Sequence, residues 1–249
     1  MCDMWQTVHN AVRDANLQPY MFKRIEAEKR TQTMAEIIID MGSGETCRND
    51  KNIIKRMIDE LAAVDTHKHR VYIKWQLFSV IPPTSPSDLL LLEWDVFDYA
   101  YRYAAKLGYQ TTSSFFDMRS LTFLLDYETP FIKVACRKHL YDMIDETPEN
   151  KRLVVSIPDP NKMDELRERY KDRDISYLCC VPEYPAVQHY YEQRFWGNLA
   201  IGISDHSKDL FLFKEWRPWV YERHMKLEDS TGYDAGAYAS TPAELGEIL

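Results

Sequence analysis

From residue 35 onward, short apolar runs alternate along the chain with longer segments whose apolar residues recur every three to four positions. The short runs predict β-strands and the longer segments predict amphipathic helices. Strands are expected at Ala35–Asp40, Arg70–Gln76, Tyr109–Phe115, Phe131–Ala135, Leu153–Ile157, Ser176–Val181, Leu199–Ser204 and Trp219–His224. Clear helices are expected at Asn52–Ala63, Leu91–Leu107, Arg119–Asp126, Asn161–Tyr170 and Ala186–Phe195, and a last one begins at Pro242. Eight strands joined by helical crossovers predict an α/β fold of the (β/α)8 TIM barrel type.

The first 33 residues do not share this alternation. They are charged and helix-prone, so we expect an N-terminal helical extension over residues 1–33 and the barrel over residues 34–249. The extension is either a leader helix packed beneath the barrel or a segment that precedes the true start at Met34.

Composition narrows the class of protein. Hydrophobic residues make up 45% and charged residues 28% of the 249 residues, as in ordinary soluble globular proteins. The net charge of -8 argues against nucleic acid or an anionic membrane as a general partner. The chain contains no apolar run of about 18 residues, no opening signal peptide and no disulfide-type cysteine spacing, so we expect a cytoplasmic, reduced protein. Neither glycine-rich nucleotide-binding signature is present.

Two lysines interrupt otherwise apolar strands. Lys74 and Gln76 fall on one face of the second strand, and Lys133 lies within the fourth. A buried ammonium group is costly without a counterion, so these lysines indicate a phosphate or carboxylate ligand. The alternative for either lysine is a misplaced strand end. Hydroxyls at Ser114, Ser156 and Ser204 follow the same strand ends and would help to bind an anion, although each alone could be a turn or cap residue.

Two histidines follow the last two predicted strands. His206 and His224 are separated by about one helix and one strand, so in a barrel both would lie at the carboxyl-terminal rim. Neutral imidazoles that converge there are natural metal ligands. The competing interpretation is two unrelated surface histidines.

Two further loops carry polar side chains near this rim. Tyr184 lies on a proline-rich turn after the sixth strand, and Asp234 lies on the loop after the eighth. Tyr184 could shape a substrate pocket and Asp234 could bind hydroxyls or transfer a proton. An ordinary turn and an isolated surface aspartate are the alternatives.

Together these motifs resemble the catalytic barrel of the sialic acid (N-acetylneuraminate) synthase family. The resemblance runs from about Ala35 to the C-terminus. It rests on Ile73-Lys74-Trp75-Gln76, Lys133, Tyr184-Pro185, Gly202-Ile203-Ser204-Asp205-His206-Ser207, Glu222-Arg223-His224 and Gly232-Tyr233-Asp234. It implies a metal-dependent transferase that condenses phosphoenolpyruvate with an aldose sugar, such as N-acetylmannosamine, and releases phosphate.

The resemblance also implies residue roles. His206 and His224 would hold Mn2+ or Mg2+. The phosphoenolpyruvate site would comprise Lys74, Lys133, Ser114, Ser156, Ser204 and Arg223. Gln76, Tyr184 and Asp234 would face the sugar, and Tyr184, Asp234 and the nearby carboxylate Glu45 are the candidate catalytic groups.

The chain departs from the family pattern at several site positions. Cys136 and Lys138 stand where the family has a serine and a catalytic glutamate, Pro182 replaces an asparagine, and the sequence ends before the family's antifreeze-like domain. We therefore expect an altered acceptor, with a catalytically inactive barrel acting as a binding or assembly module as the alternative. The family habit and the aromatic-rich helix around Trp94 suggest a homodimer, with a monomer left open.

Overall fold

The computed structural model describes residues 34–81, 89–195 and 202–249. Within them, Met34–Leu249 forms one compact unit. The strands are β1 Glu36–Asp40, β2 Arg70–Leu77, β3 Gln110–Phe115, β4 Ile132–Val134, β5 Leu153–Ile157, β6 Ile175–Cys180, β7 Gly202–Asp205, β8 Val220–Met225 and β9 Ala239–Ser240. The expected N-terminal extension lies outside the described residues.

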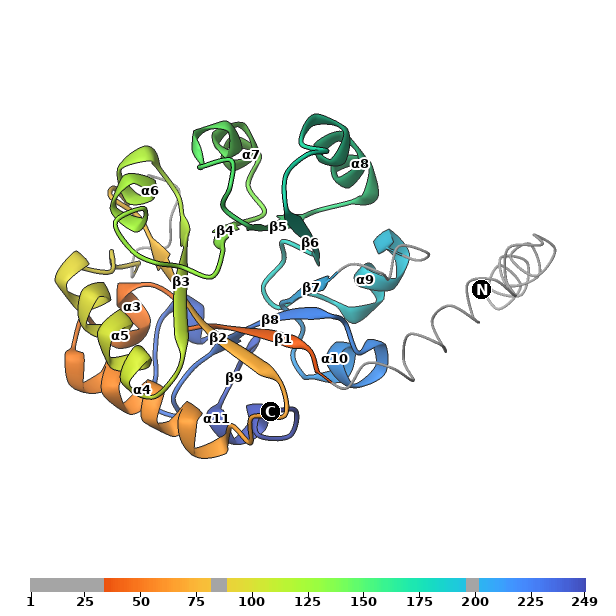
Figure 1. Ribbon diagram of the computed structural model, residues 1–249. Coiled ribbons are helices and arrows are strands. Elements are labelled where there is room, and N and C mark those ends of the chain that lie inside the picture. The colour runs from red at the N-terminus through yellow and green to blue at the C-terminus, as the bar shows by residue number, and fades with distance from the viewer. Residues whose placement is uncertain (1–33, 82–88, 196–201) are drawn as a thin grey trace, which may run out of the picture. The chain divides into compact units, whose positions relative to one another are not determined.

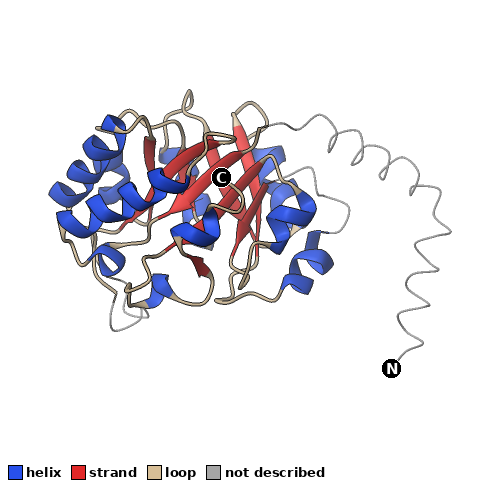
Figure 2. Ribbon diagram, turned by 90° about the horizontal axis from the view of Figure 1, so that it is seen from below, coloured by secondary structure: helices blue, strands red, loops and turns tan. Residues whose placement is uncertain are grey.

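Strands β1 to β8 form a closed parallel barrel. Each strand pairs with the next in sequence, and β1 pairs with β8, with Ile38 opposite Glu222 and Asp40 opposite His224. The short β9 adds to β8 in parallel. The strands occupy the centre and the helices lie around them (Figures 1 and 2). The (β/α)8 barrel expected from the sequence is confirmed.

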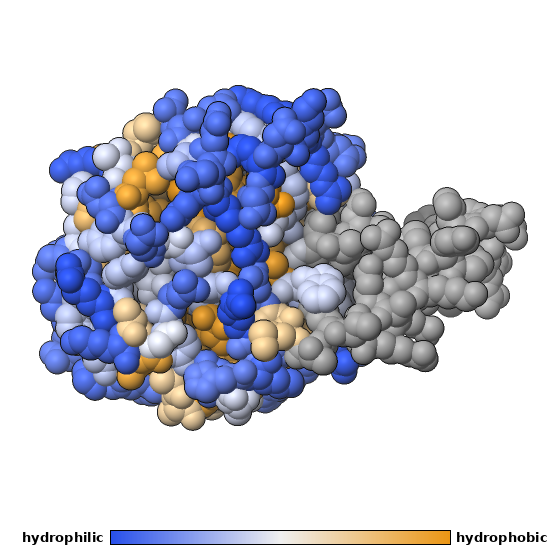
Figure 3. Space-filling view, viewed as in Figure 1, coloured by the Kyte–Doolittle hydropathy of each residue, from blue (hydrophilic) through white to orange (hydrophobic). Residues whose placement is uncertain are grey.

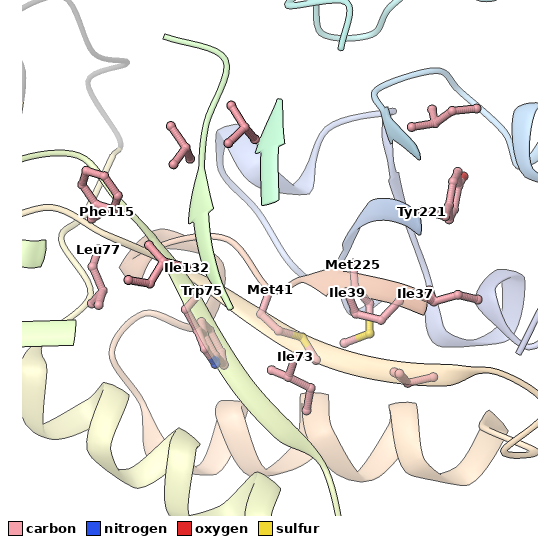
Figure 4. Close-up of a cluster of buried hydrophobic side chains, with 14 of the residues drawn as sticks. Ile37, Ile39, Met41, Ile73, Trp75, Leu77, Phe115, Ile132, Tyr221 and Met225 are labelled. Carbon is pink, nitrogen blue, oxygen red and sulfur yellow. The ribbon is translucent and has the colours of Figure 1, made fainter. Parts of the chain in front are cut away.

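Period-two alternation divides the strand residues between two environments. One set fills the lower barrel interior with apolar side chains: Ile38, Tyr72, Phe131, Val154, Leu178 and Val220. On five of these six strands the next inward position is polar, as with Asp40 after Ile38 and Lys74 after Tyr72, and on β6 it is Cys180. The outward positions pack under the helices, and Figure 4 shows Ile73 and Trp75 pointing from the sheet toward the helices below it. Polar groups therefore gather inside the barrel at the carboxyl ends of its strands.

The helices are α3 Gly44–Cys47, α4 Lys51–Val64, α5 Trp94–Lys106, α6 Met118–Leu124, α7 Lys138–Asp142, α8 Pro160–Arg169, α9 Gln188–Phe195, α10 Phe211–Trp216 and α11 Pro242–Leu245. The 3-10 turns are η1 Met143–Glu146 and η2 Tyr233–Ala235. The five clear helices expected from the sequence are present, with ends displaced by up to three residues. Helices α3, α7 and α10 span only four to six residues and are too short for apolar periodicity to reveal.

The aromatic residues of α5 pack within the helix layer. Phe97 is buried and contacts the rings of Phe123 and Tyr127, and Trp94 stacks on Phe123 with ring centroids 4.5 Å apart. Tyr103 donates a 2.6 Å hydrogen bond to Asp59 on α4. These contacts account for the aromatic content without a second subunit, so the homodimer remains a prediction.

Hydrophilic side chains cover most of the face shown in Figure 3, with hydrophobic ones visible between them in patches. Among the described residues, no helix combines the length and apolar character needed to cross a lipid bilayer.

Candidate active site at the carboxyl ends of the barrel strands

A cavity of about 680 Å3 opens at the carboxyl ends of the strands. Its inner wall consists of the upper inward residues of the barrel, and its outer wall comes from the loops that follow them. The lining residues are Asp40, Lys74, Gln76, Phe78, Leu89, Ser114, Phe116, Lys133, Ala135, Cys136, Arg137, His139, Ser156, Cys180, Pro182, Tyr184, Ser204, His206, Glu222, His224, Tyr233 and Asp234. Most of the site residues expected from the sequence are therefore brought together.

Lys74 lies at the centre of a buried charge network. Its Nζ is 2.6 Å from Oδ2 of Asp40 and 3.2 Å from Oε1 of Glu222, and it also donates a 3.2 Å hydrogen bond to Ser114. Burial alone would lower the pKa of Lys74, but the two carboxylates hold it above its ordinary value. Burial would likewise raise the pKa of Asp40, and the Lys74 charge holds it below its usual range. Lys74 is therefore a charged group with internal counterions.

Lys133 shares one of those counterions. Its Nζ lies 3.4 Å from Oε2 of Glu222 and donates a 2.8 Å hydrogen bond to Ser156. Burial lowers the pKa of Lys133. Although burial opposes it, attraction to the two lysines lowers the pKa of Glu222 to about 2. Two lysines thus share two carboxylates, Asp40 and Glu222, and the lysine and serine donors line the cavity, where they could bind an anionic ligand.

His206 and His224 both line the cavity, with ring centroids 5.6 Å apart. Burial lowers the pKa of both imidazoles, that of His206 to about 3, so both are neutral near pH 7. The Nδ1 of His206 lies 2.9 Å from the carbonyl oxygen of Val181. A carbonyl only accepts, so Nδ1 carries the proton and Nε2 presents a lone pair.

These two rings can serve as a pair of metal ligands. Among the described residues, no group of three or more histidine, cysteine, aspartate or glutamate side chains is arranged to hold a metal ion. His224 nevertheless keeps a buried Nδ1 that has no hydrogen-bond partner within the described part of the chain. Neutral imidazoles with one orphan nitrogen fit a divalent cation whose other ligands are water and substrate.

Asp234 lies beside the histidines, and its Oδ1 is 3.9 Å from Nδ1 of His224. Burial, together with the nearby charges of Asp40 and Glu45, raises its pKa to about 7. A carboxyl with this pKa exchanges protons readily at neutral pH. Glu45 lies behind it, outside the cavity lining, and accepts a 2.6 Å hydrogen bond from the backbone N–H of Asp234. The structure thus places Glu45 as a support for Asp234, where the sequence suggested a catalytic group.

Tyr184 and Gln76 occupy two sides of the cavity. The Tyr184 ring lies 4.2 Å from that of His206 and 5.6 Å from that of Tyr233, so aromatic faces form one wall. Gln76 donates a 3.2 Å hydrogen bond to Asp40 from the other side. Both residues line the cavity.

The structure places Arg223 outside the cavity lining, and its expected role in substrate binding stays a prediction. On β8, the inward positions are Glu222 and His224, and alternation turns Arg223 to the outer face. Its guanidinium donates to Ser240 at 2.9 Å and to the Ser207 carbonyl at 2.7 Å, and it lies 3.5 Å from Asp205. Arg223 is buried behind the barrel wall and does not line the cavity.

The positions that depart from the expected family pattern differ in their relation to the cavity. Cys136 and Pro182 line the cavity, whereas Lys138 begins α7, is exposed and does not. Sequence reasoning gave no role to Asp40 or Cys180. Asp40 was detectable, because it ends its strand and follows the inward residue Ile38 by two positions, just as Lys74 follows Tyr72. Cys180 lies in an apolar run that gives no comparable signal.

Comparison with known proteins identifies the family. The model of the NeuB family matches residues 87–249, which is more than half of the chain. The chain belongs to the NeuB family. This match begins after β2, so Asp40, Lys74 and Gln76 lie outside it. No curated protein matches the chain.

Solved structures share the fold of this NeuB family member. N-acetylneuraminic acid (sialic acid) synthetase from Leptospira borgpetersenii, solved with citrate, has 20% identity and a TM-score of 0.69, and the match covers 85% of this chain and 80% of that one. Putative spore coat polysaccharide biosynthesis protein E from Chromobacterium violaceum has 16% identity, coverages of 86% and 72%, and a TM-score of 0.69. A truncated 3-deoxy-D-arabino-heptulosonate 7-phosphate synthase from Thermotoga maritima has 11% identity, coverages of 87% and 84%, and a TM-score of 0.59. At these identities the similarity establishes the barrel fold.

Proposed function

We propose that this barrel is a metal-dependent synthase that condenses phosphoenolpyruvate with an aldose sugar. The observation that carries the proposal is the pair of buried lysines, Lys74 and Lys133, inside the cavity with serine hydroxyls beside them. Family membership and the synthases among the structural neighbours support it. The acceptor differs from that of the family because several of the family's site positions are changed.

Phosphoenolpyruvate would bind where the positive charge lies. Lys74 and Lys133 would neutralise its phosphate and carboxylate, and Ser114, Ser156 and Ser204 would donate hydrogen bonds to their oxygens. Charge-assisted bonds in a site shielded from water are stronger than the same bonds at the surface. Glu222 would remain between the two ammonium groups and fix their positions.

The acceptor would lie between the histidines and the aromatic wall. Gln76 and Tyr184 would contact its hydroxyls and ring, and Asp234 would exchange a proton with it near neutral pH. His206 and His224 would hold Mn2+ or Mg2+, which, when bound, polarises the aldehyde oxygen and orients water. A carbon–carbon bond would form between the phosphoenolpyruvate methylene carbon and the aldehyde carbon, water would add, and phosphate would leave.

One observation favours a second candidate, a catalytically inactive barrel that binds an anionic ligand. Both interior lysines already have carboxylate partners, and Lys138, where the family has a carboxylate, lies outside the cavity lining. A binding module needs only the lysines and hydroxyls, whereas a synthase also needs groups that move protons.

Incubation with phosphoenolpyruvate, manganese and a panel of aldoses that includes N-acetylmannosamine tests the proposal. Phosphate release with a product whose mass equals the condensed sugar acid is the expected result, and Lys74→Met and Lys133→Met should abolish it. A thermal shift with phosphoenolpyruvate but no phosphate release from any aldose would favour the binding module. Absence of both would refute the two candidates together.

A further inference from the structure

Tyr191 lies behind the cavity wall on α9, and its side chain is fully buried. Its hydroxyl donates a 2.7 Å hydrogen bond to the carbonyl oxygen of Ser204 and accepts a 3.0 Å hydrogen bond from the backbone N–H of His206. These two backbone groups lie on either side of Asp205, the last residue of β7 (Figure 1). Because a buried N–H is costly without a partner, the hydroxyl stabilises this one conformation of the chain at His206.

Other contacts hold His206 from the same stretch of chain. The backbone N–H of Ala186 donates a 2.7 Å hydrogen bond to the carbonyl oxygen of His206, and Nδ1 of the imidazole lies 2.9 Å from the carbonyl oxygen of Val181. Residues 181–191 thus hold both the main chain and the ring of His206. Val181 and Ala186 contribute main-chain groups, which many residues could supply, whereas the contact of Tyr191 depends on its hydroxyl.

Tyr221 places a second buried hydroxyl beside the same turn, but on a different target. Its side chain is also fully buried and donates a 2.6 Å hydrogen bond to Oδ2 of Asp205. The other oxygen of that carboxylate accepts a 2.7 Å hydrogen bond from the backbone N–H of Ser207, and Asp205 does not line the cavity. Tyr221 therefore supports a side chain outside the cavity lining, whereas Tyr191 contacts the backbone of a residue whose ring lines it.

We propose that Tyr191 is a positioning residue for His206. Its hydroxyl fixes the backbone at His206, and the fixed backbone directs Nδ1–H of the imidazole to the Val181 carbonyl, so that Nε2 remains available as a ligand atom. The inference rests on the proposed function, in which His206 is one of two protein ligands of a divalent cation. Groups that orient a ligating histidine affect metal affinity because a misdirected ring, or one protonated on the ligating nitrogen, binds more weakly.

The orientation of the ring is measurable without any metal. The metal-free full chain with isotope-labelled histidine is studied by NMR, and the His206 signals are assigned by comparison with His206→Gln. The imidazole proton should lie on Nδ1, and the backbone amide of His206 should be protected from hydrogen exchange. A ring protonated on Nε2, or an amide that exchanges as fast as an exposed one, would overturn the proposal with the wild-type protein alone.

Tyr191→Phe removes the hydroxyl and keeps the ring that packs in the core. In this variant the His206 amide should lose its protection, and the imidazole signals should move toward those of a mixture of tautomers. Calorimetric titration with phosphoenolpyruvate present should show manganese binding at least about tenfold weaker than in wild type. Tyr221→Phe is the matched control, because it also loses one fully buried hydroxyl beside the turn. Its His206 spectrum should match wild type, and its manganese affinity should stay within about twofold.

The outcomes separate positioning from a general weakening of the fold. Tyr191→Phe with the His206 spectrum and the manganese affinity of wild type would overturn the proposal. Equal losses of affinity in Tyr191→Phe and Tyr221→Phe would also overturn it, since the effect would then follow from the loss of any buried hydroxyl near the turn. A wild-type protein that binds no manganese would instead refute the metal site of the proposed function, and the metal-free spectra would decide the role of Tyr191.

Discussion

Nζ of Lys133 lies 3.4 Å from Oε2 of Glu222, and the other oxygen of the same carboxylate lies 3.2 Å from Nζ of Lys74. All three side chains are buried. One carboxylate is thus the counterion of two ammonium groups inside the barrel. It stabilises the cavity wall and reduces the positive charge that a ligand meets there. Breaking a buried ion pair from one side leaves the remaining charge without a partner.

Glu222→Gln should destabilise the fold and tighten anion binding at the same time. The two lysines lose a shared counterion, so the free energy of unfolding should fall by about 3–5 kcal/mol. The same lysines then attract inorganic phosphate more strongly. Urea unfolding with and without phosphate, together with calorimetric titration of phosphate, measures both effects. Glu215→Gln, an exposed substitution on α10, should change stability by less than about 0.5 kcal/mol. Unchanged or weaker phosphate binding in Glu222→Gln would show that the lysines do not form the anion site.

Arg223→Met should affect stability and leave ligand binding intact. The guanidinium is the buried partner of Asp205, so its removal is expected to cost about 3–5 kcal/mol. Lys74→Met is the comparison, because that side chain lines the cavity and should lose anion affinity. Phosphate titrations below the melting temperature of each variant decide the matter. A large loss of phosphate affinity in Arg223→Met would mean that the arginine reaches the cavity after all.

The barrel was predictable because its signal is repeated. Eight apolar runs with helical crossovers are enough to specify a parallel barrel, and alternation places Lys74 and Gln76 inside and Trp75 outside. The same rule applied to β8 places Glu222 and His224 inside. The expectation that Arg223 binds substrate came from a family position, whereas the alternation of this strand places its side chain outside the cavity lining.

Other features depend on distances that a single sequence does not contain. Whether a strand-end lysine meets a free anion or an internal carboxylate depends on the register between β1, β2 and β8, which places Asp40 opposite both Lys74 and His224. This relationship does not follow from periodicity or composition.

Gly202→Ala should destabilise the barrel through steric overlap. A Cβ at this position on β7 would lie 2.4 Å from Cδ2 of Leu178 and 2.5 Å from the carbonyl oxygen of Val220, so β6 and β8 would have to move. Overpacking of this kind typically costs about 1–3 kcal/mol. Gly108→Ala is the control, because that site has positive φ but open space, and its strain should be about 1–2 kcal/mol. Combining Gly202→Ala with Leu178→Ala should restore part of the lost free energy of unfolding, measured by urea unfolding. If the double variant recovers none of it, the steric explanation is excluded.

The stability difference between wild type and Cys136→Ser should depend on pH. The pKa of Cys136 is lowered to about 7 by the Cys180 hydrogen bond and nearby positive charges, so the folded state favours the thiolate. Its contribution is present above the ordinary thiol pKa and is lost as pH falls through about 7. Wild type should therefore gain on the order of 1–2 kcal/mol over the variant between pH 6 and pH 9.

Cys47→Ala supplies the control for that titration. Burial raises the pKa of Cys47 to about 11, so its thiol stays protonated in both states below about pH 8 and its contribution should be constant there. Urea unfolding of the three proteins at several pH values under reducing conditions measures the differences. A Cys136→Ser difference as flat as that of Cys47→Ala would show that the folded state does not stabilise the Cys136 thiolate.

The last prediction concerns the pair of histidines. If His206 and His224 are the two protein ligands of a divalent cation, manganese should bind weakly alone and more tightly once phosphoenolpyruvate or the acceptor supplies further oxygen ligands. His206→Ala and His224→Ala should each abolish the binding that calorimetric titration detects in wild type. His139→Ala is the matched control, because His139 lines the same cavity but is exposed at its rim. Its manganese affinity should stay within about twofold of wild type, since a change of that size is less than 0.5 kcal/mol. Equal manganese affinity in wild type, His206→Ala and His224→Ala would mean that the paired imidazoles play no part in holding a metal.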